Sequence, residues 1–464
     1  SLEEWKSAEE LVEFLAEEDF THVELHPVME YLDDITGGYS TYAYYAPTSR
    51  FGSVVDFQKL VDELHQAGIG VILDWVPAHF PKDAHGLADF DGQALYEYAD
   101  PRKGEHPDWG TKVFDYSRNE VSNFLIANAL YWIEQYHIDG LRVDAVASML
   151  YLDYGRTPGN WVPNQYGENK NLEAIEFFRH LNSVVNKQGH GAAVIAEEST
   201  AWPMVTGRPE DGGLGFKFKW NMGWMHDFLE YMKLDPYFRK FNHNKMTFGM
   251  TYATSENFIL VLSHDEVVHL KCSMINKMPG IYEDKFANLK VGYTFMMGHP
   301  GKKLLFMGQD FAQMDEWNEN ASIEWELLQY PIHSQMKEYV KELNHLYTSH
   351  PALYQKDYQT EGFEWINCMD AADNIIAFLR RGADETLLFV CNFAPQLHEK
   401  LAVGVPFKGK YKEIFNSDAE KFGGSGKVNP RMKSSKAEEC DGKENSITIQ
   451  LAPLGISVFN CTPT

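Results

Sequence analysis

The stretch GIGVILDWV, residues 68–76, is an apolar run that opens on glycine and is rich in Val, Ile and Leu. Such a run is typical of a parallel β-strand that other elements cover on both faces. Asp74 stands near its carboxyl end, and His79 follows shortly after it. The stretch therefore predicts a buried strand whose polar residues collect at one end.

Similar runs recur along the chain: THVELHPV (21–28), GLRVDAV (140–146), AAVIAEES (192–199), GFKFKW (215–220), FILVLSHDE (258–266) and KKLLFMGQDF (302–311). Helical patterns lie before, between or after them, at 2–18, 53–67, 119–137, 171–187, 286–297 and 334–347. This alternation predicts a parallel α/β sheet. Polar pairs close the runs: Asp74 with His79, Arg142 with Asp144, Glu197 with Glu198, His264 with Asp265, and Gln309 with Asp310. Polar groups at the carboxyl ends of parallel strands are the layout of a (β/α)8 barrel.

An open, doubly wound sheet is the alternative, but no GxGxxG or GxxxxGK[ST] phosphate loop follows any of the strands. Seven strands are recognised, not eight, so we expect the first barrel strand to be missing from this chain. After about residue 350, short strand-like runs separated by turn residues predict an all-β sandwich: NIIAFLRR (374–381), TLLFVCNFA (386–394), YKEIFNS (411–417), SITIQLAP (446–453) and GISVFN (455–460). We therefore expect a barrel domain at 1–350, with a long strand-to-helix loop at 77–118, and a β-sandwich domain at 351–464.

The net charge and the cysteine content limit which binding partners and which compartment we expect for this protein. Acidic residues outnumber basic ones 67 to 41, for a net charge of −26, which argues against a nucleic-acid partner. No apolar run is long enough for a transmembrane helix. The cysteines are scattered and form no CxxC pair, so we expect free thiols: Cys272, Cys368, Cys391, Cys440 and Cys461. The acidic excess suits a neutral ligand in a reducing cytosol, although solubility alone is the favoured explanation for the surface at large. We predict a cytoplasmic monomer that binds neither nucleic acid nor membrane.

Arg142 and Asp144 stand two residues apart in one strand, so their side chains lie on the same side. A buried structural ion pair would explain them without any function. That explanation weakens when Glu197 and Asp265 are added, because three carboxylates would then converge with one arginine. Crowded carboxylates force one of them to hold its proton. We expect Arg142 to keep Asp144 ionised and Glu197 to be the protonated acid, which is the apparatus of glycoside cleavage and transfer.

Two histidines and a tyrosine extend this prediction. His79 and His264 stand at strand ends beside carboxylates but outside the HExxH spacing of a zinc site. We expect them to donate hydrogen bonds to sugar hydroxyls, and we expect no metal and no organic cofactor. Tyr39, in the tyrosine-rich loop 37–47, fits the face of a saccharide subsite, although ordinary packing is the alternative for most of these aromatic residues.

These residues match a known pattern. The strand-end segments DWVPAHF (74–80), GLRVDAVASML (140–150), VIAEEST (194–200) and LSHDEVVH (262–269) resemble, in order, those of the α-amylase superfamily of retaining α-glucan enzymes. Further segments resemble bacterial-type 1,4-α-glucan branching enzymes: FTHVELHPVMEY (20–31), YYAPTSRFG (44–52), GGLGFKFKWNMGWMHDFLEYMKLDP (212–236), KLLFMGQDFAQ (303–313) and EWNENASIEW (316–325). The resemblance covers nearly all of the chain.

The resemblance implies a role for each site residue. Asp144 would be the nucleophile, Glu197 the general acid and base, and Asp265 the third carboxylate, which holds the sugar. Arg142, His79 and His264 would orient the nucleophile and the sugar, with Tyr39 as the stacking platform. Asp74 and Asp310 would be supporting polar residues. The resemblance also implies that the family's first barrel strand and amino-terminal glucan-binding domain would precede residue 1.

The predicted activity is that of a retaining glycosyltransferase of glycogen biosynthesis. It would cleave an internal α-1,4 bond of a linear glucan, such as glycogen or amylose, and transfer the chain to a 6-hydroxyl as an α-1,6 branch. Two alternatives stay open at this point: an α-1,4-glucan hydrolase with the same carboxylates, and a non-catalytic glucan-binding protein if the missing strand prevents a closed barrel.

Overall fold

The computed structural model describes residues 4–464, which form two compact units. The amino-terminal unit comprises residues 4–220 and the carboxyl-terminal unit comprises residues 221–464. Residues 2 and 3 of the expected helix at 2–18 lie outside the described residues. The remainder of that segment forms a 3-10 turn, Trp5–Ser7, and the helix α1, Ala8–Glu17.

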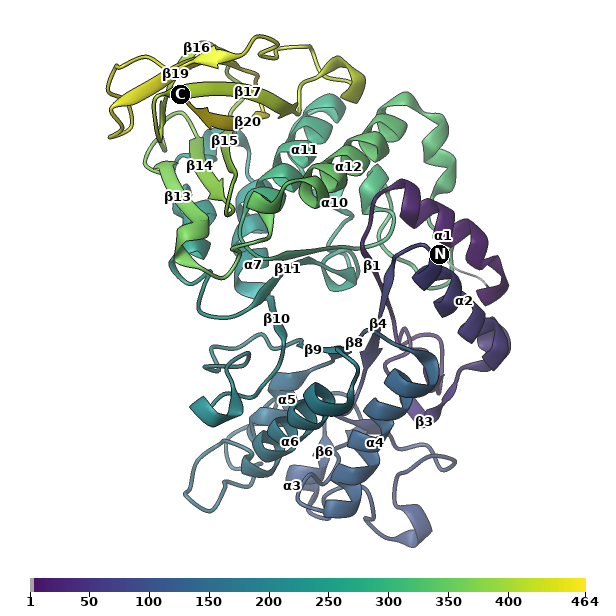
Figure 1. Cartoon of the computed structure of the whole chain (residues 1–464). Coiled ribbons are helices and arrows are strands. Elements are labelled where there is room, and N and C mark those ends of the chain that lie inside the picture. Colours follow the sequence, from purple (N-terminus) through teal and green to yellow (C-terminus); the bar gives the residue numbers. More distant parts are fainter. Residues whose placement is uncertain (1–3) are drawn as a thin grey trace. The chain divides into compact units, whose positions relative to one another are not determined.

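The amino-terminal unit is built on five parallel strands in the order β1-β4-β8-β9-β10 (Figure 1). These strands are β1 (His22–Leu25), β4 (Gly70–Trp75), β8 (Gly140–Val143), β9 (Ala193–Ala196) and β10 (Phe218–Asn221). The longer helices between them are α2 (Val54–Gln66), α4 (Asn119–Tyr136) and α6 (Leu172–Gln188), and the short helix α5 (Val146–Leu150) follows β8. All five strands lie where the sequence predicts them, and α2, α4 and α6 agree with the expected helices to within one residue at each end.

Local signals explain where helix α2 begins. The Ser53 side chain accepts a hydrogen bond from the Asp56 backbone N–H, and the Asp56 carboxylate accepts one in return from the Ser53 N–H. This capping box satisfies two donors that a helix start leaves unpaired. The apolar face of α2, which includes Phe57 and Leu60, is buried in the core of this unit.

The predicted loop at 77–118 has structure of its own. It contains a small antiparallel sheet in the order β5-β7-β6, made of Phe80–Pro81, Thr111–Lys112 and Glu105–His106, together with the short helix α3, Pro101–Gly104. A separate hairpin pairs β2 (Met29–Tyr31) with β3 (Thr41–Pro47) and frames the loop that carries Tyr39. Both insertions follow carboxyl ends of the parallel strands, where a barrel of this kind builds its site.

The carboxyl-terminal unit contains the parallel pair β11 (Phe258–Leu262) and β12 (Lys302–Leu305). Its helices are α7 (Met222–Met232), α8 (Pro236–Arg239), α9 (Asn244–Thr247), α10 (Met274–Lys277), α11 (Tyr282–Gly298) and α12 (Pro331–Ser349). The seven predicted barrel strands are therefore all present. Helix α7 was not among the predicted helices, and α11 begins four residues earlier than expected.

The last hundred residues form a β-sandwich. One sheet has the order β13-β14-β15-β20-β17-β18, and β16 and β19 form the second. The strands are β13 (Phe363–Asn367), β14 (Ile375–Arg381), β15 (Thr386–Asn392), β16 (His398–Val405), β17 (Gly409–Asn416), β18 (Lys433–Ser434), β19 (Asn445–Leu451) and β20 (Gly455–Pro463). The two sheets share an apolar core that includes Leu379, Val390 and Ile449.

Strand β14 is buried on both of its faces. Ile375, Ala377 and Leu379 point into the sandwich core, so the intervening residues point the other way. Phe378 lies on that second face, where it stacks on Phe389 with ring centroids 5.0 Å apart and approaches Gly298 of helix α11.

The buried Arg380 also links β14 to α11. Its Nη1 donates to the Gly298 carbonyl at 2.7 Å, and its Nη2 donates to Asp357 Oδ1 at 2.8 Å. At the last residue of α11, a Cβ added to Gly298 would lie 2.7 Å from a Phe389 ring carbon and 2.9 Å from a Phe378 ring carbon. Helix and sandwich therefore pack tightly within the carboxyl-terminal unit.

The cysteines and the lengths of the helices were both subjects of expectations from the sequence. All five cysteines are free, as predicted, with Cys391 and Cys461 buried. Within residues 4–464, no helix is both long enough and apolar enough to cross a lipid bilayer.

Candidate active site

A pocket of about 410 Å³ opens at the carboxyl ends of the strands in the amino-terminal unit. Four of the predicted site residues line it: Tyr39, His79, Asp144 and Glu197. Asp144 follows β8 directly and Glu197 follows β9, and these two strands are hydrogen-bonded neighbours. The parallel register thus brings together two carboxylates that stand 53 residues apart in the chain.

Arg142 holds the Asp144 carboxylate in place. Its side chain is 1% exposed, and its Nη1 donates to Asp144 Oδ1 at 3.0 Å and to Asp74 Oδ2 at 3.1 Å. The guanidinium carbon also lies 4.0 Å from the ring centroid of Trp220, a cation–π distance. Arg142 and Asp74 are paired across β8 and β4. One buried cation therefore fixes two carboxylates from neighbouring strands.

Glu24, from β1, is a third acid close to Arg142. Burial is the main cause that raises the pKa of Glu24 well above its usual value, with the neighbouring Asp74 charge adding to it. Burial alone would also raise the pKa of Asp74, but Arg142 and hydrogen bonds from Glu24 and Tyr39 outweigh it and lower that pKa. The Tyr39 hydroxyl donates to Asp74 Oδ2. Because Glu24 is protonated and neutral, Arg142 faces two full negative charges, those of Asp74 and Asp144, instead of three.

Glu197 is held differently. Its Oε2 accepts a hydrogen bond from the backbone N–H of Ala145 at 2.7 Å, and its carbonyl accepts one from Val146 at 3.0 Å. Ala145 adopts φ 53°, a left-handed conformation that a non-glycine residue rarely takes. This turn directs the N–H that follows Asp144 toward Glu197. The two acids are therefore positioned by one short segment, with a cation on one and a neutral donor on the other.

The neighbouring Glu198 serves a structural purpose. Its side chain is fully buried, and its Oε2 lies 2.9 Å from Lys219 Nζ. Lys219 also donates to the Thr200 carbonyl at 3.0 Å. Of the two adjacent acids, Glu197 is the one predicted for the site, and it lines the pocket.

The aromatic wall of the pocket comes largely from the insertion at 77–118. Burial lowers the pKa of His79 to about 4, so the ring is neutral near pH 7. Its centroid lies 5.2 Å from that of Trp109, which is 42% exposed, and Trp109 lies 5.8 Å from Tyr154. These exposed aromatic faces can take the C–H face of a sugar, with a neutral imidazole beside it as a hydrogen-bond partner.

The other predicted residues lie in the carboxyl-terminal unit. His264 and Asp265 follow β11, and His264 Nε2 lies 3.3 Å from Asp265 Oδ1. Asp310 is buried in the short turn Gln309–Phe311 that follows β12. Each stands at the carboxyl end of its strand, as the sequence predicts. Within residues 4–464, no cluster of three or more His, Cys, Asp or Glu side chains is arranged to hold a metal ion.

Sequence reasoning missed several residues of this site. Glu24 is the one acidic side chain inside the first apolar run, and that isolated charge was the available signal. Trp109 and Tyr154 carry no such signal, because they reach the pocket through the folding of long loops. Trp220 could have been suspected from its position at the end of the run GFKFKW.

Comparison with known proteins now decides the family. The model for the α-amylase catalytic domain matches residues 5–109 and 105–373, and the model for the α-amylase C-terminal all-β domain matches residues 365–462. The chain belongs to the α-amylase family. The predicted fold class, a (β/α)8-type barrel followed by an all-β domain, is thereby confirmed.

Curated relatives place the chain more narrowly in this family. It is 58% identical over 454 residues to a 1,4-α-glucan branching enzyme of Butyrivibrio fibrisolvens, with 97% of this chain and 71% of the relative covered. Branching enzymes of Gloeobacter violaceus and Methylococcus capsulatus are 57% and 55% identical over 97% and 98% of this chain, but the chain spans 62% of the length of each. The chain is thus a member of the 1,4-α-glucan branching enzymes, as predicted.

Solved structures support the fold independently. The α-amylase of Geobacillus thermoleovorans in complex with acarbose aligns with a TM-score of 0.71 at 15% identity and covers 99% of this chain and 92% of the other. An α-amylase of Anoxybacillus aligns with a TM-score of 0.69 at 18% identity, covering 98% and 90%. At such identities the likeness bears on the fold and not on the substrate.

Proposed function

We propose that this branching-enzyme chain cleaves an internal α-1,4 bond of a linear glucan and transfers the released chain to a 6-hydroxyl of another glucan. The observation that carries the proposal is the pairing of Asp144 and Glu197 in one aromatic-walled pocket, the first held by Arg142 and the second by the Ala145 N–H. Two carboxylates with different partners are what retaining glycoside chemistry needs.

The first step makes a covalent intermediate. The Asp144 carboxylate attacks the anomeric carbon, and the bond from that carbon to the glycosidic oxygen breaks. Glu197 gives its proton to the departing oxygen. In the second step, Glu197 takes a proton from the incoming 6-hydroxyl, whose oxygen displaces Asp144 and forms the α-1,6 bond. Two inversions at the anomeric carbon leave its configuration retained.

The remaining predicted residues have supporting roles in this proposal. Arg142 keeps the nucleophile ionised and oriented, and Asp74 and Glu24 hold that arginine. His79, together with Tyr39 and Trp109, binds the donor sugar. For Asp265 and His264, support comes from the family motif LSHDEVVH, which assigns Asp265 the third carboxylate role. Asp310 is proposed as a supporting polar residue on the same basis.

Incubation with amylose separates branching from hydrolysis. Branching lowers the iodine colour while few new reducing ends form, whereas hydrolysis raises reducing ends in step with the loss of colour. We expect the first pattern. Asp144→Asn should lower the rate by at least about a thousandfold, because the variant lacks the nucleophile. Glu134→Gln, an exposed change on α4, is the control that should keep the full rate.

Mass spectrometry can assign the two acids separately. With maltosyl fluoride, whose leaving group needs no acid, Glu197→Gln should accumulate a glycosyl-enzyme, and peptide mapping should find the sugar on Asp144. Asp144→Asn should show no adduct. Asp265→Asn should slow the formation of the adduct. A sugar found on any other residue would contradict the assigned nucleophile.

The proposal includes the cytoplasm as compartment, with a monomer as the working unit. All five cysteines are free thiols, a state typical of a reducing compartment. Light scattering during size-exclusion chromatography should give a mass near 53 kDa for this chain. A mass of twice that value would refute the monomer.

A further inference from the structure

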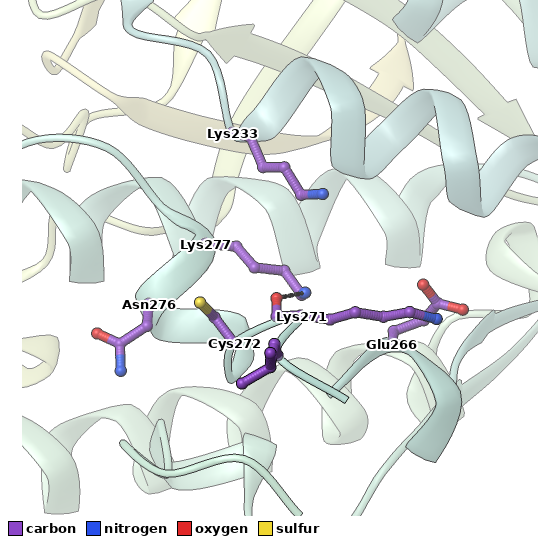
Figure 2. Close-up of a pocket in the computed structure, with 7 residues that line it drawn as sticks. Lys233, Glu266, Lys271, Cys272, Asn276 and Lys277 are labelled. Atoms are coloured by element: carbon purple, nitrogen blue, oxygen red, sulfur yellow. Dashed lines mark hydrogen bonds between the residues drawn. The ribbon is translucent and has the colours of Figure 1, made fainter. Parts of the chain in front are cut away.

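A second pocket, of about 470 Å³, lies within the carboxyl-terminal unit, and three lysines help to line it. Lys233 comes from the end of α7, Lys271 from the segment before α10, and Lys277 from the last turn of α10. Figure 2 shows Lys233 and Lys277 near each other, with the Cys272 thiol beside Lys277, while Lys271 extends toward Glu266. The Lys271 ammonium donates one hydrogen bond to the Asp265 backbone carbonyl at 2.8 Å. The lining thus carries three potential cations and one carboxyl group.

This concentration of cations runs against the charge of the whole chain, which is −26. Within the described residues, none of the three lysines forms an ion pair, although Lys245 and Lys421 in the same unit both do. The pocket lysines are therefore not explained as halves of structural salt bridges.

Lys277 is the most informative of the three. It is 7% exposed, and its ammonium group donates to the Lys271 backbone carbonyl (Figure 2). An ammonium group has three hydrogens to donate, and this carbonyl is the one acceptor that it meets among the described residues. Burial lowers the pKa of Lys277 to about 8, and the charge of Lys233 adds to the effect. A buried amine with spare donors faces an open space.

Glu266 does not neutralise the group. Burial raises the pKa of its carboxyl group, against the opposing influence of Lys271 and Lys277. Its side chain is 7% exposed and meets no hydrogen-bond donor within residues 4–464. Even with Glu266 fully ionised and Lys277 protonated, the three lysines leave a surplus of two positive charges.

The rim of the pocket is held in a fixed shape. The Glu316 carboxylate accepts the backbone N–H groups of Leu270 and Cys272 at 2.9 and 3.2 Å. Both of these residues adopt a left-handed backbone, with φ of 66° and 69°, which costs energy and requires support from the surroundings. This support turns the Lys271 carbonyl toward Lys277 and keeps the pocket open between the lysines.

We propose that this pocket binds a small molecule through a phosphate group. Lysine donors suit the acceptor-only oxygens of a phosphate, which Lys binds as a point charge. The volume exceeds that of a bare ion and falls in the range of pockets for small metabolites. A phosphate monoester of a sugar has the required charge and size, and free inorganic phosphate shares the recognised group.

Titration calorimetry at low ionic strength tests the proposal, with inorganic phosphate and glucose 6-phosphate as separate probes. We expect saturable binding of one molecule per chain. Tighter binding of the sugar ester would identify the ester as the ligand, and equal affinities would identify free phosphate. Lys233→Glu and Lys277→Met should each weaken binding by at least tenfold. Lys341→Glu, an exposed charge reversal on α12, is the matched control and should leave the affinity unchanged.

Proton linkage supplies a second readout. At pH 8.5, about three quarters of Lys277 is neutral if its pKa is about 8. An anion raises the pKa of a neighbouring amine, so phosphate binding should take up about half a proton or more. The other titratable groups that influence this pocket are Lys233, Lys271, Glu266 and Cys272, with His226 and Asp265 acting on Glu266. Calorimetry in buffers of different ionisation enthalpy measures the uptake.

Lys233 is exposed, so its variant should fold even if the Lys277 variant does not. Absence of saturable binding by either probe would overturn the proposal. Binding that Lys233→Glu leaves unchanged, or that Lys341→Glu weakens equally, would also overturn it, because the anion would then lie elsewhere. Binding without proton uptake at pH 8.5 would remove Lys277 from the site.

Discussion

Glu197 and Glu198 are neighbours in the chain, but their carboxylates lie in different surroundings. Successive residues at a strand end point to opposite sides. Glu197 therefore faces the pocket, while Glu198 faces the interior and pairs with Lys219. Which of the two adjacent acids belongs to the site is decided by the register of β9 alone.

This difference predicts opposite effects for two similar substitutions. Glu197→Gln should abolish transfer of glucan chains but change the free energy of unfolding little, because the amide oxygen can still accept the hydrogen bond from the Ala145 N–H. Glu198→Gln should lower stability by about 3 kcal/mol, because Lys219 would keep a buried, uncompensated charge. Urea unfolding and the iodine assay measure the two quantities. Equal loss of stability in both variants would contradict the separation.

At this scale, the sequence could indicate Asp144, Glu197 and His79 because each follows an apolar strand and matches a family motif. It could not indicate Trp109, which enters the pocket through packing against His79. Glu24 was also missed, because nothing in an isolated β1 shows that its side chain meets Asp74 from the next strand.

Strand β14 illustrates what can be predicted for whole elements. The segment NIIAFLRR reads as a continuous apolar run, which correctly predicts a strand. The run is continuous because one face packs into the sandwich and the other meets helix α11. Strand β16 was missed because its first half, which contains Glu399 and Lys400, is exposed and polar. Helix α7 was missed because its aromatic residues and methionines do not form a clear polar face.

The contact between α11 and β14 gives an element-scale prediction. Gly298→Ala would normally favour a helix by about 1 kcal/mol. Here the new methyl group would overlap the rings of Phe378 and Phe389, so we expect a net destabilisation of about 1–3 kcal/mol.

Thermal unfolding followed by circular dichroism checks this result. In the control Gly223→Ala on α7, the atom nearest to the added Cβ is the Tyr252 hydroxyl at 3.1 Å, the far end of a side chain that can shift slightly, so no comparable destabilisation is expected. A higher melting temperature for Gly298→Ala would show that the packing is looser than described.

On the scale of the whole molecule, several histidines are buried in the neutral form. Burial lowers the pKa of His79 to about 4 and lowers those of His106 and His299 to about 3. These values lie below 6.5, the value for an exposed histidine. As the pH falls below about 6.5, these histidines bind protons in the unfolded chain but stay neutral in the folded chain. Each of these histidines therefore costs about 1.4 kcal/mol of stability per pH unit, until the pH reaches its lowered pKa.

His299→Gln isolates one of these contributions. The variant should lose about 2 kcal/mol less than the parent between pH 7 and pH 5, because glutamine does not titrate. Urea midpoints at the two pH values measure the difference. His180→Gln, at an exposed histidine, should follow the parent chain. Identical slopes for the His299 variant and the parent would refute the role of burial.

The order of the parallel strands and of the longer helices, except α7, could be predicted because most of these strands are buried and all read as apolar runs, although β1 and β12 are only partly buried. The small sheet of Phe80–Pro81, Glu105–His106 and Thr111–Lys112 could not, since two-residue strands leave no periodic pattern. The lysine pocket also escaped notice, because Lys233 and Lys277 stand 44 residues apart and are joined by the turns around α10.

Because β14 packs into the sandwich on one face and against α11 on the other, it limits where two related chains can be joined to make a hybrid. A hybrid that took its last hundred residues from a related enzyme would present foreign side chains to α11, where Gly298 leaves no spare room. It would also have to recreate the reach of Arg380 to a carbonyl that the other parent supplies. The crossover point should therefore lie ahead of α11, so that the helix and the sandwich are inherited from the same parent.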